Sequence, residues 1–321
     1  MLKNKVIIIT GAAGFIGSHL TEVLLENSNF LILIDNFNDY YLGKEERLEK
    51  ITSNYQIKKD FILIREDLKS KSFNDKINYE IDYIFHLAAQ AGVRYSIENP
   101  IEVSRNNIIS TLNILEFAAK IDNLKKFIYS SSSSVYGNPI YTPCDEEHPK
   151  NPISPYAVSK LTGEIYTDYY NRENHLPTTS LRFYTVYGPN GRPDMAIYKF
   201  FNLMLQNKEL TIYGNGEQLR DFTYISDIVD GLILAAKTEQ AKGKTFNLGY
   251  SNPITINNLV DKMYKITDKT KKIRYIQKQK GDVDITHSEI TKAKKILNFK
   301  PKVDITEGLK LQYQWQSKIK K

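Results

Sequence analysis

At 321 residues, the chain is long enough to bury a substantial core in one large domain or two modest ones. Apolar residues make up 41% and charged residues 25%, and no apolar run approaches the ~20 residues that a membrane span needs. The net charge of +7 comes from scattered lysines that alternate with acids, except at 269–272 and 318–321. We therefore expect a solvated basic surface that attracts a small anionic substrate, with no nucleic-acid or membrane partner.

Cysteine and histidine usage excludes two further classes of site. Cys144 is the only cysteine, so the chain has no disulfide framework, and the five histidines form no metal-like cluster. An apolar run typical of a strand begins at Val6, so close to the N-terminus that we expect no signal peptide. We expect a cytoplasmic protein without a metal.

The first 185 residues alternate short apolar runs with helix-like stretches. Strands are expected at 5–10, 31–35, 61–64, 82–86, 125–130 and 179–183. Helices are expected near 15–27, 100–120 and 155–172. This alternation predicts an α/β fold, a Rossmann-type doubly wound parallel sheet. The strands are continuously apolar, as expected when helices cover both faces of the sheet.

After residue 186 the pattern changes to shorter elements and glycine-rich loops. Expected here are a helix near 195–207, a strand at 222–225, a helix at 227–237, a helix capped by Thr255 and one beginning near Asp304. We predict a large N-terminal nucleotide-binding domain at 1–185 with a return segment at about 221–250. A smaller C-terminal α/β substrate-binding domain would consist of 186–220 and 251–321.

A glycine-rich turn lies between the first expected strand and the first expected helix. Its sequence places Phe15 and Ile16 among Gly11, Gly14 and Gly17. Such glycines let the backbone approach a pyrophosphate at the helix N-terminus. The strand before, the helix after and an acid at the end of the second strand give this weak motif the context that it needs.

Three further segments end neighbouring strands of the predicted sheet. Asp35 ends the second strand and is suited to accept hydrogen bonds from a ribose diol, while it would repel a 2′-phosphate; this favours NAD over NADP. Asp67 and Leu68 follow the third strand and are expected beside the adenine. His86 ends the fourth strand and is expected to be a packed residue, followed by the small run Leu87-Ala88-Ala89 at the cofactor.

A serine run and a Tyr-Lys pair carry the chemistry. Ser131 to Ser134 end the fifth strand, where ligands bind in an open α/β sheet. Tyr156 and Lys160 are four residues apart and project from one face of a helix. An ammonium beside a phenol favours the phenolate, which makes Tyr156 a candidate general base. These groups indicate chemistry on an alcohol or a ketone.

The combined motifs resemble the extended short-chain dehydrogenase/reductase superfamily, in particular its nucleotide-sugar epimerases and dehydratases. The motifs are the GxxGxxG turn, the HLAA run at 86–89, the serine run with Val-Tyr-Gly, and YxxxK. Segments at 35–41, 91–96 and 181–195 are similar to UDP-glucuronate 4-epimerases. The resemblance extends to Gly281-Asp282 and so covers nearly the whole chain.

The resemblance implies roles for individual residues. Tyr156 would be the base and acid, Lys160 would orient the nicotinamide ribose and lower the pKa of the phenol, and Ser132 would bind the reacting oxygen. Asn107 matches a residue that supports the lysine. Tightly bound NAD would take a hydride from C4 of the sugar and return it to the other face of a 4-keto intermediate.

Residues beside the serine run separate the reactions of the superfamily. The 4,6-dehydratases of the superfamily that this chain resembles carry an Asp-Glu pair immediately before Val-Tyr-Gly, and its UDP-glucuronate decarboxylases carry a glutamate there. This chain has Ser133 and Ser134 at those positions. Thr185 replaces an asparagine that is common in epimerases of neutral sugars. These hydroxyls are suited to hold a uronate carboxylate as neutral donors.

Basic residues are assigned to the remainder of the substrate. Arg192 and Arg220 are the candidates for the UDP pyrophosphate, because guanidinium groups bind phosphates in bidentate fashion. By resemblance, Asp282 would bind the uridine ribose and Arg94 would contact the substrate. Many relatives have an arginine just before Gly-Asp, where this chain has Gln279-Lys280, so phosphate contacts there are left open.

The leading expectation is a UDP-glucuronate 4-epimerase that forms UDP-galacturonate for polysaccharide. The alternatives are a UDP-glucose or UDP-N-acetylglucosamine 4-epimerase, a UDP-glucuronate decarboxylase and, from a different class, an inactive NAD-binding regulatory protein. The resemblance also implies a homodimer through a four-helix bundle of the helices near 100–120 and 155–172.

Overall fold

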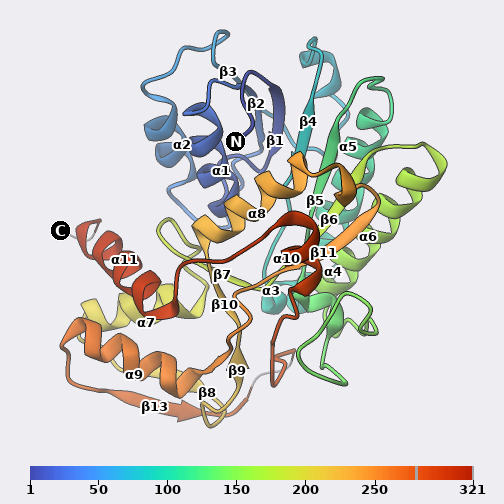
Figure 1. The fold of residues 1–321 in the computed structure, drawn as a ribbon. Coiled ribbons are helices and arrows are strands. Elements are labelled where there is room, and N and C mark those ends of the chain that lie inside the picture. Colours follow the sequence, from blue (N-terminus) through green and yellow to red (C-terminus); the bar gives the residue numbers. More distant parts are fainter. Residues whose placement is uncertain (279–280, 320–321) are drawn as a thin grey trace.

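The computed structural model describes residues 1–278 and 281–319 and contains a seven-stranded parallel sheet (Figure 1). Its strands are β1 (Val6–Thr10), β2 (Phe30–Asp35), β3 (Phe61–Arg65), β4 (Tyr83–His86), β5 (Lys126–Ser132), β6 (Thr178–Phe183) and β11 (Lys244–Leu248). Their order is β3-β2-β1-β4-β5-β6-β11, and every neighbouring pair is parallel. The predicted Rossmann-type sheet is confirmed, and its order reverses between β1 and β4.

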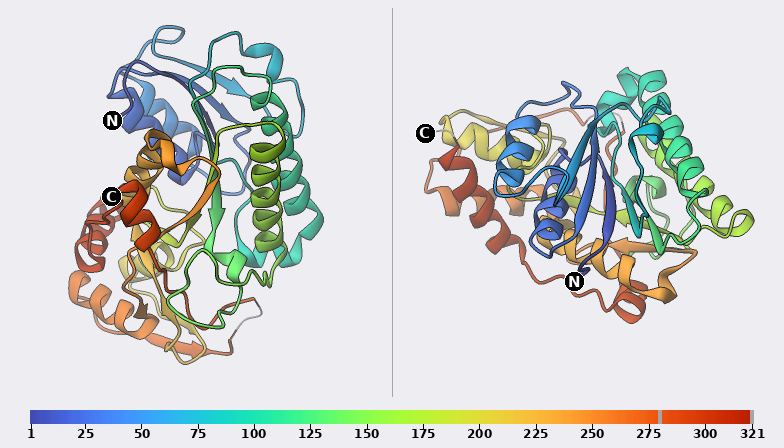
Figure 2. Two further views of the ribbon diagram at one scale, coloured as in Figure 1. Left: turned by 45° about the vertical axis from the view of Figure 1, so that its right-hand side comes forward. Right: turned by 90° about the horizontal axis from the view of Figure 1, so that it is seen from above.

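Helices cover both faces of this sheet, as the continuously apolar strands require. Alternate residues of β1 point to opposite sides, so that Ile7 and Ile9 enter one core and Ile8 enters the other. On the first side lie α1 (Phe15–Leu25) and α8 (Ile225–Lys237). On the second side lie α5 (Ser110–Ala118) and α6 (Pro155–Glu173), which form an outer layer in Figure 2.

Shorter helices complete the N-terminal half. They are α2 (Lys44–Thr52), the 3₁₀ turn Asn74–Lys76, α3 (Val93–Glu98), α4 (Pro100–Ser104), a π-helix at Arg105–Ile109 and the 3₁₀ turn η3 (Ser133–Tyr136). The helix expected near 100–120 is therefore one continuous path whose middle turn is π-helical. A π-turn within an α-helix is a local irregularity that is frequent at functional sites.

Most of the remaining elements gather beside the carboxyl edge of the sheet (Figure 1), whereas the 3₁₀ turn Glu239–Ala241 lies at the amino ends of β5 and β6. The others are α7 (Ala196–Leu205), α9 (Ile256–Thr267), α10 (Thr291–Leu297), α11 (Ile305–Lys318) and the strand pairs β7 (Thr185–Tyr187) with β10 (Phe222–Tyr224), β9 (Leu219–Arg220) with β12 (Ile254–Thr255), and β8 (Leu210–Tyr213) with β13 (Ile273–Ile276). The expected cap at Thr255 is confirmed, because its Oγ1 accepts from the N–H of Asn258. The helix expected to begin near Asp304 is α11, and the Asp304 carboxylate accepts from two of its N–H groups.

One strand differs in its position from the expectation. The strand predicted at 222–225 belongs to the expected return segment, but β10 pairs with β7 outside the large sheet. The strand that returns is β11, which pairs with β6. Asp221 explains the difference, because its buried carboxylate accepts hydrogen bonds from Ser251 and Ser288 and ties β10 to that side. The domain limits themselves stay a prediction.

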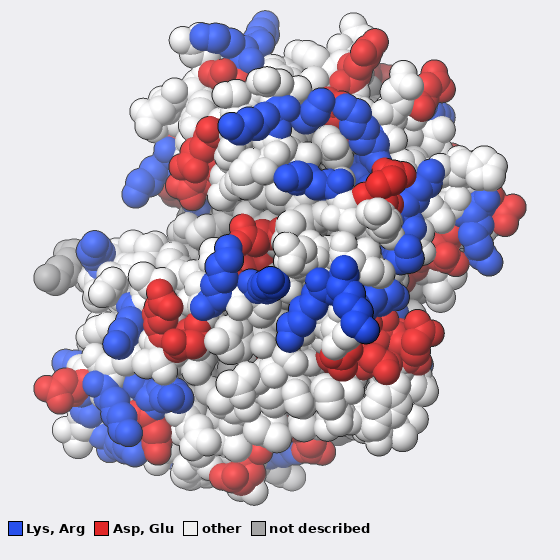
Figure 3. Space-filling model, viewed as in Figure 1, with Lys and Arg blue, Asp and Glu red and all other residues white. Residues whose placement is uncertain are grey.

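Positive and negative side chains alternate over the face seen in Figure 3, in agreement with the scattered charge of the sequence. Within residues 1–278 and 281–319, no helix is long and apolar enough to cross a membrane. The same residues contain no group of three or more His, Cys, Asp or Glu side chains that could hold a metal ion.

Candidate active site

The glycine turn connects β1 to α1 in close contact with the end of β4. Gly11 has a positive φ of 70°, and a Cβ there would lie 2.8 Å from the backbone of Ala88. A Cβ on Gly17 would lie 2.0 Å from the carbonyl oxygen of Gly11. Gly14 is the N-cap of α1 and supplies no side-chain cap, so the first N–H groups of the helix are left for a ligand or water.

This turn forms one end of a cleft that lies at the switch point between β1 and β4. Most of the predicted cofactor residues line it. They are Gly11, Gly14, Phe15, Ile16, Gly17, Asp35, Asp67, Leu68, Leu87, Ala88, Ala89, Tyr156 and Lys160. A single cleft therefore runs from the glycine turn to the predicted catalytic pair.

Asp35 is fixed at the end of β2 by backbone donors. One carboxylate oxygen accepts from the N–H of Ala13 at 2.9 Å, and the other accepts from the N–H of Phe37 at 2.8 Å. Burial raises the pKa of this carboxyl, and the two N–H donors and the charge of Lys44 oppose that rise. The carboxylate is thereby oriented on the cleft wall, where a ribose diol would meet it.

The start of α6 sets the position of Tyr156 and Lys160. Ser154 Oγ caps the helix by accepting from the N–H of Ala157 at 3.2 Å, and Pro155 occupies the first helical position. Tyr156 thus lies in the first turn and Lys160 one turn later. The Ser132 hydroxyl, from the end of β5, lies close enough to the Tyr156 phenol to lower its pKa. The three predicted catalytic residues are brought together.

Burial dominates the electrostatics of this pair. It lowers the pKa of Lys160 to about 7, and the carboxylate of Glu164 acts in the opposite direction. Burial raises the pKa of Tyr156, whereas the charge of Arg192 and the hydrogen bond from Ser132 lower it. Lys160 Nζ donates to the carbonyl oxygen of Ser130 at 2.8 Å, which holds the ammonium against β5.

Asn107 lies in the π-helical turn and connects three segments around the cleft. Its side chain accepts from the N–H of Gln90 at 2.7 Å and donates to the carbonyl of Gln90 and to Ser159 Oγ at 2.8 Å. Ser159 Oγ in turn donates to the carbonyl oxygen of Tyr156 at 2.8 Å. Asn107 therefore supports the first turn of α6 through Ser159.

His86 is a packed residue, as expected. It is fully buried between Thr10 Oγ1, 2.7 Å from Nδ1, and Thr111 Oγ1, 3.0 Å from Nε2. Burial lowers its pKa to about 3, and the nearby positive charge of Lys160 contributes. The ring is neutral at physiological pH and has a structural role.

The hydroxyls assigned to a uronate leave the sheet at the same edge. Ser132 lies opposite Phe183 in the β5–β6 register, so Ser133, Ser134 and Thr185 follow neighbouring strands. All three are half-buried. Ser132 Oγ accepts from the N–H of Ser134 at 3.2 Å and caps η3, which turns the two following serines out of the strand.

The residues assigned to UDP fall into two places. Arg94, Arg220 and Asp282 lie near one another: Arg94 pairs with Asp282 at 3.1 Å, and Arg220 donates to the carbonyl of Val283 at 2.7 Å. Arg192 lines the cleft instead and makes a two-bond contact with Asp194 at 2.9 and 2.7 Å. Gln279 and Lys280 lie outside the described residues.

The cleft also contains residues that the sequence reasoning did not assign. Among them are Asn36, Asn38, Tyr40, Tyr41, Lys44, Gln90, Asn106, Ser110, Ser130 and Phe183. The similarity of the segment at 35–41 to UDP-glucuronate 4-epimerases is a signal that could have identified Asn36, Asn38, Tyr40 and Tyr41 as cleft residues. Ser130 could have been predicted from its place in the serine run. Phe183 lines the cleft only because β6 pairs with the distant strand β5, which the sequence does not reveal.

A family model, protein sequences and solved structures all match this chain over nearly its whole length. The family model described as GDP-mannose 4,6 dehydratase matches residues 8–312. UDP-glucuronate 4-epimerase of Thermodesulfobacterium geofontis is 38% identical and aligns over 96% of this chain and 95% of that protein. Two solved structures are similar along their length. Bacillus cereus UDP-glucuronic acid 4-epimerase, in complex with UDP-glucuronic acid and NAD, has 35% identity, a TM-score of 0.89 and coverage of 98% of this chain and 99% of that one. Thermotoga maritima UDP-glucose 4-epimerase, with UDP-glucose, has 34% identity, a TM-score of 0.90 and coverage of 98% and 100%.

Proposed function

This chain belongs to the GDP-mannose 4,6 dehydratase family, within the extended short-chain dehydrogenase/reductase superfamily, and we propose that it is an NAD-dependent UDP-sugar 4-epimerase. We further propose UDP-glucuronate as the substrate and UDP-galacturonate as the product. The observation that carries the proposal is the convergence of Ser132, Tyr156 and Lys160 beside the glycine-turn cleft. The similar epimerases named above support the reaction type.

The residues of the cleft fit a dinucleotide. The glycine turn leaves no room for side chains between β1 and β4, and the uncapped start of α1 presents N–H groups to a pyrophosphate. Asp35 would accept hydrogen bonds from the adenosine ribose and disfavour a 2′-phosphate. When bound, NAD accepts a hydride from C4 of the sugar and later returns it.

The protein residues supply orientation and proton transfer. Tyr156 takes the proton of the C4 hydroxyl as hydride leaves that carbon, which gives a 4-keto sugar. Ser132 bonds the same oxygen, and Lys160 contributes positive charge beside the phenolate. After the keto sugar turns over in the site, hydride returns to the opposite face and Tyr156 gives the proton back to O4. The reaction therefore has no net redox change.

A uronate substrate imposes a further requirement. Its 4-keto form is a β-keto acid that can lose carbon dioxide, so an epimerase has to hold the carboxylate by hydrogen bonds that preserve its charge. Ser133, Ser134 and Thr185 can donate such bonds from one edge of the sheet. The serine run also provides no acid for the elimination of water, which disfavours the dehydration that names the family.

The assignment of the nucleotide follows from the second group of basic residues. We assign UDP binding to the segments 186–220 and 251–321, with Arg94, Arg220 and Asp282 at the uridine end. Arg192, which lies beside Tyr156 in the cleft, would then contact the diphosphate from the side of the sugar. Its pairing with Asp194 holds the guanidinium in place before the substrate binds.

A neutral UDP-sugar is the second candidate, because the UDP-glucose 4-epimerase of Thermotoga maritima is equally similar in structure. Product analysis distinguishes a UDP-glucuronate epimerase from an epimerase of neutral UDP-sugars. Purified protein is incubated with UDP-glucuronate, UDP-glucose or UDP-N-acetylglucosamine, and the products are identified by NMR. We expect UDP-galacturonate from the first substrate. Turnover of neutral sugars alone, or a UDP-pentose with carbon dioxide, would contradict the proposal.

We also propose that the protein is a homodimer, whose contact would be made by the outer layer of α4, α5 and α6. Apolar side chains project from this layer and are strongly exposed, among them Ile101, Val158, Ile165 and Tyr169. Light scattering should give twice the chain mass, and Ile165→Glu should reduce it to one chain. The expected cytoplasmic location stays a prediction that cell fractionation would test.

A further inference from the structure

The most buried ion pair in the described part of the chain lies directly behind the reacting groups. Arg182 on β6 meets Glu164 on α6 in a two-bond fork, with Nε 2.9 Å from Oε1 and Nη2 2.7 Å from Oε2. Their side chains are 3% and 7% exposed. Glu164 is one helical turn beyond Lys160. Desolvation of two charges costs free energy that their attraction often does not recover, so a buried ion pair is weak evidence of stabilisation. We therefore look for a functional role of this pair beside the catalytic residues.

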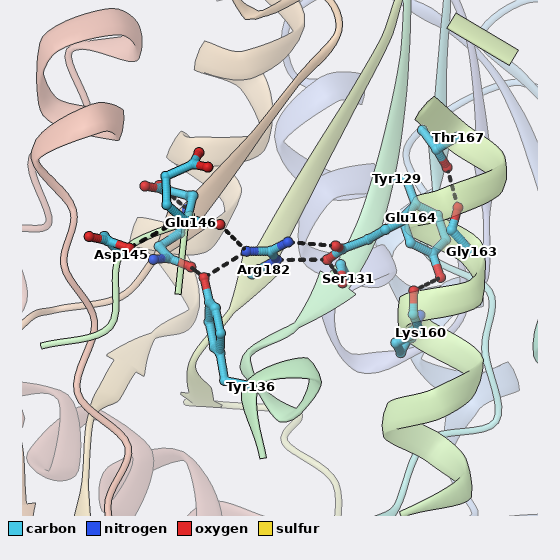
Figure 4. Close-up of polar contacts among 12 residues, drawn as sticks. Tyr129, Ser131, Tyr136, Asp145, Glu146, Lys160, Gly163, Glu164, Thr167 and Arg182 are labelled. Atoms are coloured by element: carbon cyan, nitrogen blue, oxygen red, sulfur yellow. Dashed lines mark hydrogen bonds and ion pairs between the residues drawn. The ribbon is translucent and has the colours of Figure 1, made fainter. Parts of the chain in front are cut away.

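The pair joins the end of the serine strand to the catalytic helix (Figure 4). Ser131 Oγ donates to Glu164 Oε1, and Tyr129 OH donates to the carbonyl oxygen of Lys160 at 3.2 Å. Tyr129 and Ser131 are two residues apart and therefore share one face of β5. These two contacts fasten β5 to α6 on either side of Ser130, whose carbonyl accepts from Lys160 Nζ.

The other side of Arg182 extends the same network to the turn that follows the serines. Its Nη1 donates to the phenolic oxygen of Tyr136 at 2.8 Å and to the carbonyl of Glu146 at 3.0 Å. Tyr136 OH donates to Asn247 Oδ1 at 2.6 Å. Arg182 thus fixes both the start of η3, through Glu164 and Ser131, and its end at Tyr136.

We propose that Glu164 and Arg182 are positioning residues that set the end of β5 against α6, so that Ser132 meets Tyr156 and Lys160 in reactive geometry. This inference rests on the catalytic assignment of those three residues made above. A clamp of this kind serves catalysis because small misplacements of reacting groups are costly to rate. It acts through Ser131 and the backbone, without contact with the substrate.

The charge of Glu164 adds a second effect on Lys160. The groups near the Lys160 ammonium are His86 from β4, Tyr129 from β5 and Glu164 from α6, and the centroid of the Tyr129 ring lies 5.2 Å from Lys160 Nζ. His86 is neutral, so Glu164 is the negative group that opposes the effect of burial on the ammonium. Loss of that charge, with the guanidinium of Arg182 still present, would let Lys160 lose its proton at a lower pH.

Four variants test the proposal on whichever UDP-sugar the native protein converts. Glu164→Gln removes the charge and keeps the shape, and Ser131→Ala removes only the contact with β5. Glu164→Leu combined with Arg182→Met replaces the ion pair by apolar groups, which proteins often tolerate without loss of stability. Asp261→Asn, which breaks an exposed ion pair with Lys271, is the matched control. Folding is verified by circular dichroism and thermal unfolding.

We expect kcat to fall about tenfold in Glu164→Gln and in the folded double variant, with KM nearly unchanged. The alkaline limb of the kcat profile should move down by about one pH unit in Glu164→Gln. Ser131→Ala should lower kcat several-fold, and the control should match the native protein. Native kcat in the folded double variant or in Ser131→Ala would overturn the proposal, as would an unshifted profile in Glu164→Gln. Native turnover by Tyr156→Phe would instead overturn the catalytic assignment.

Discussion

The packing of the glycine turn makes a prediction whose magnitude follows from the structure. A Cβ on Gly17 would lie 2.0 Å from the carbonyl oxygen of Gly11 and 2.9 Å from its carbon. Ordinary contact begins near 3.4 Å, so Gly17→Ala has to separate two backbone segments by about 1.4 Å. Overpacking of this kind costs about 3 kcal/mol. For a chain of this length that corresponds to a fall in Tm of about 4 °C.

Gly14→Ala is the matched control for this substitution. Its Cβ would meet the same carbonyl oxygen at 3.1 Å, which the turn can absorb by a shift of a few tenths of an ångström. Differential scanning calorimetry of both variants without added nucleotide measures the effect on the fold. Titration with NAD then measures whether the displaced turn still binds the cofactor. The packing argument would be refuted if the Tm of Gly17→Ala lay within 1 °C of the native Tm. It would also be refuted if the Tm values of Gly17→Ala and Gly14→Ala were the same.

Three further predictions concern the cofactor, the acid limit of stability and the carboxylate. Asp35→Asn should weaken NAD binding about tenfold and narrow the preference over NADP, measured by calorimetric titration of both nucleotides; unchanged discrimination would contradict the role of Asp35. The pKa of His86 is about 3 in the folded chain and 6.5 in the unfolded one, so its contribution is present above pH 6.5 and is lost as the pH falls toward 3. His86→Asn should therefore flatten the pH dependence of unfolding between about pH 6.5 and 4, and a slope equal to the native one would speak against it. Thr185→Val should raise the fraction of UDP-pentose formed from UDP-glucuronate several-fold, which gas-phase detection of carbon dioxide measures; an unchanged fraction would remove Thr185 from the carboxylate site.

Local signals in the sequence predicted the sheet and the cofactor turn well. The strands are short continuous apolar runs that helices separate, so their positions follow from the pattern of apolar residues along the chain. Gly11 and Gly17 mark a turn whose tightness the structure explains by direct contact with Ala88 and with the turn itself. The Tyr156-Lys160 spacing likewise places both side chains on one helix face without any knowledge of the fold.

Pairings between distant segments could not be predicted in the same way. Residues 222–224 look like a further strand of the large sheet, but the hydrogen bonds of the buried Asp221 hold them beside β7. The π-helical turn at 105–109, which aims Asn107 at Gln90 and Ser159, has no recognisable composition. The role of Arg182 could not be predicted, because its partner Glu164 is 18 residues away in the sequence and meets it only when β6 packs against α6.

Transfer of a hydride away from C4 and back is the central claim, and an isotope at that position tests it most directly. UDP-glucuronate that carries deuterium at C4 is converted in ordinary water, and NMR locates the label in the product. The proposed reaction keeps the hydride in the site, so UDP-galacturonate should retain deuterium at C4. Replacement of the label by solvent hydrogen in the epimerised product, or a UDP-pentose in place of a uronate, would contradict the account.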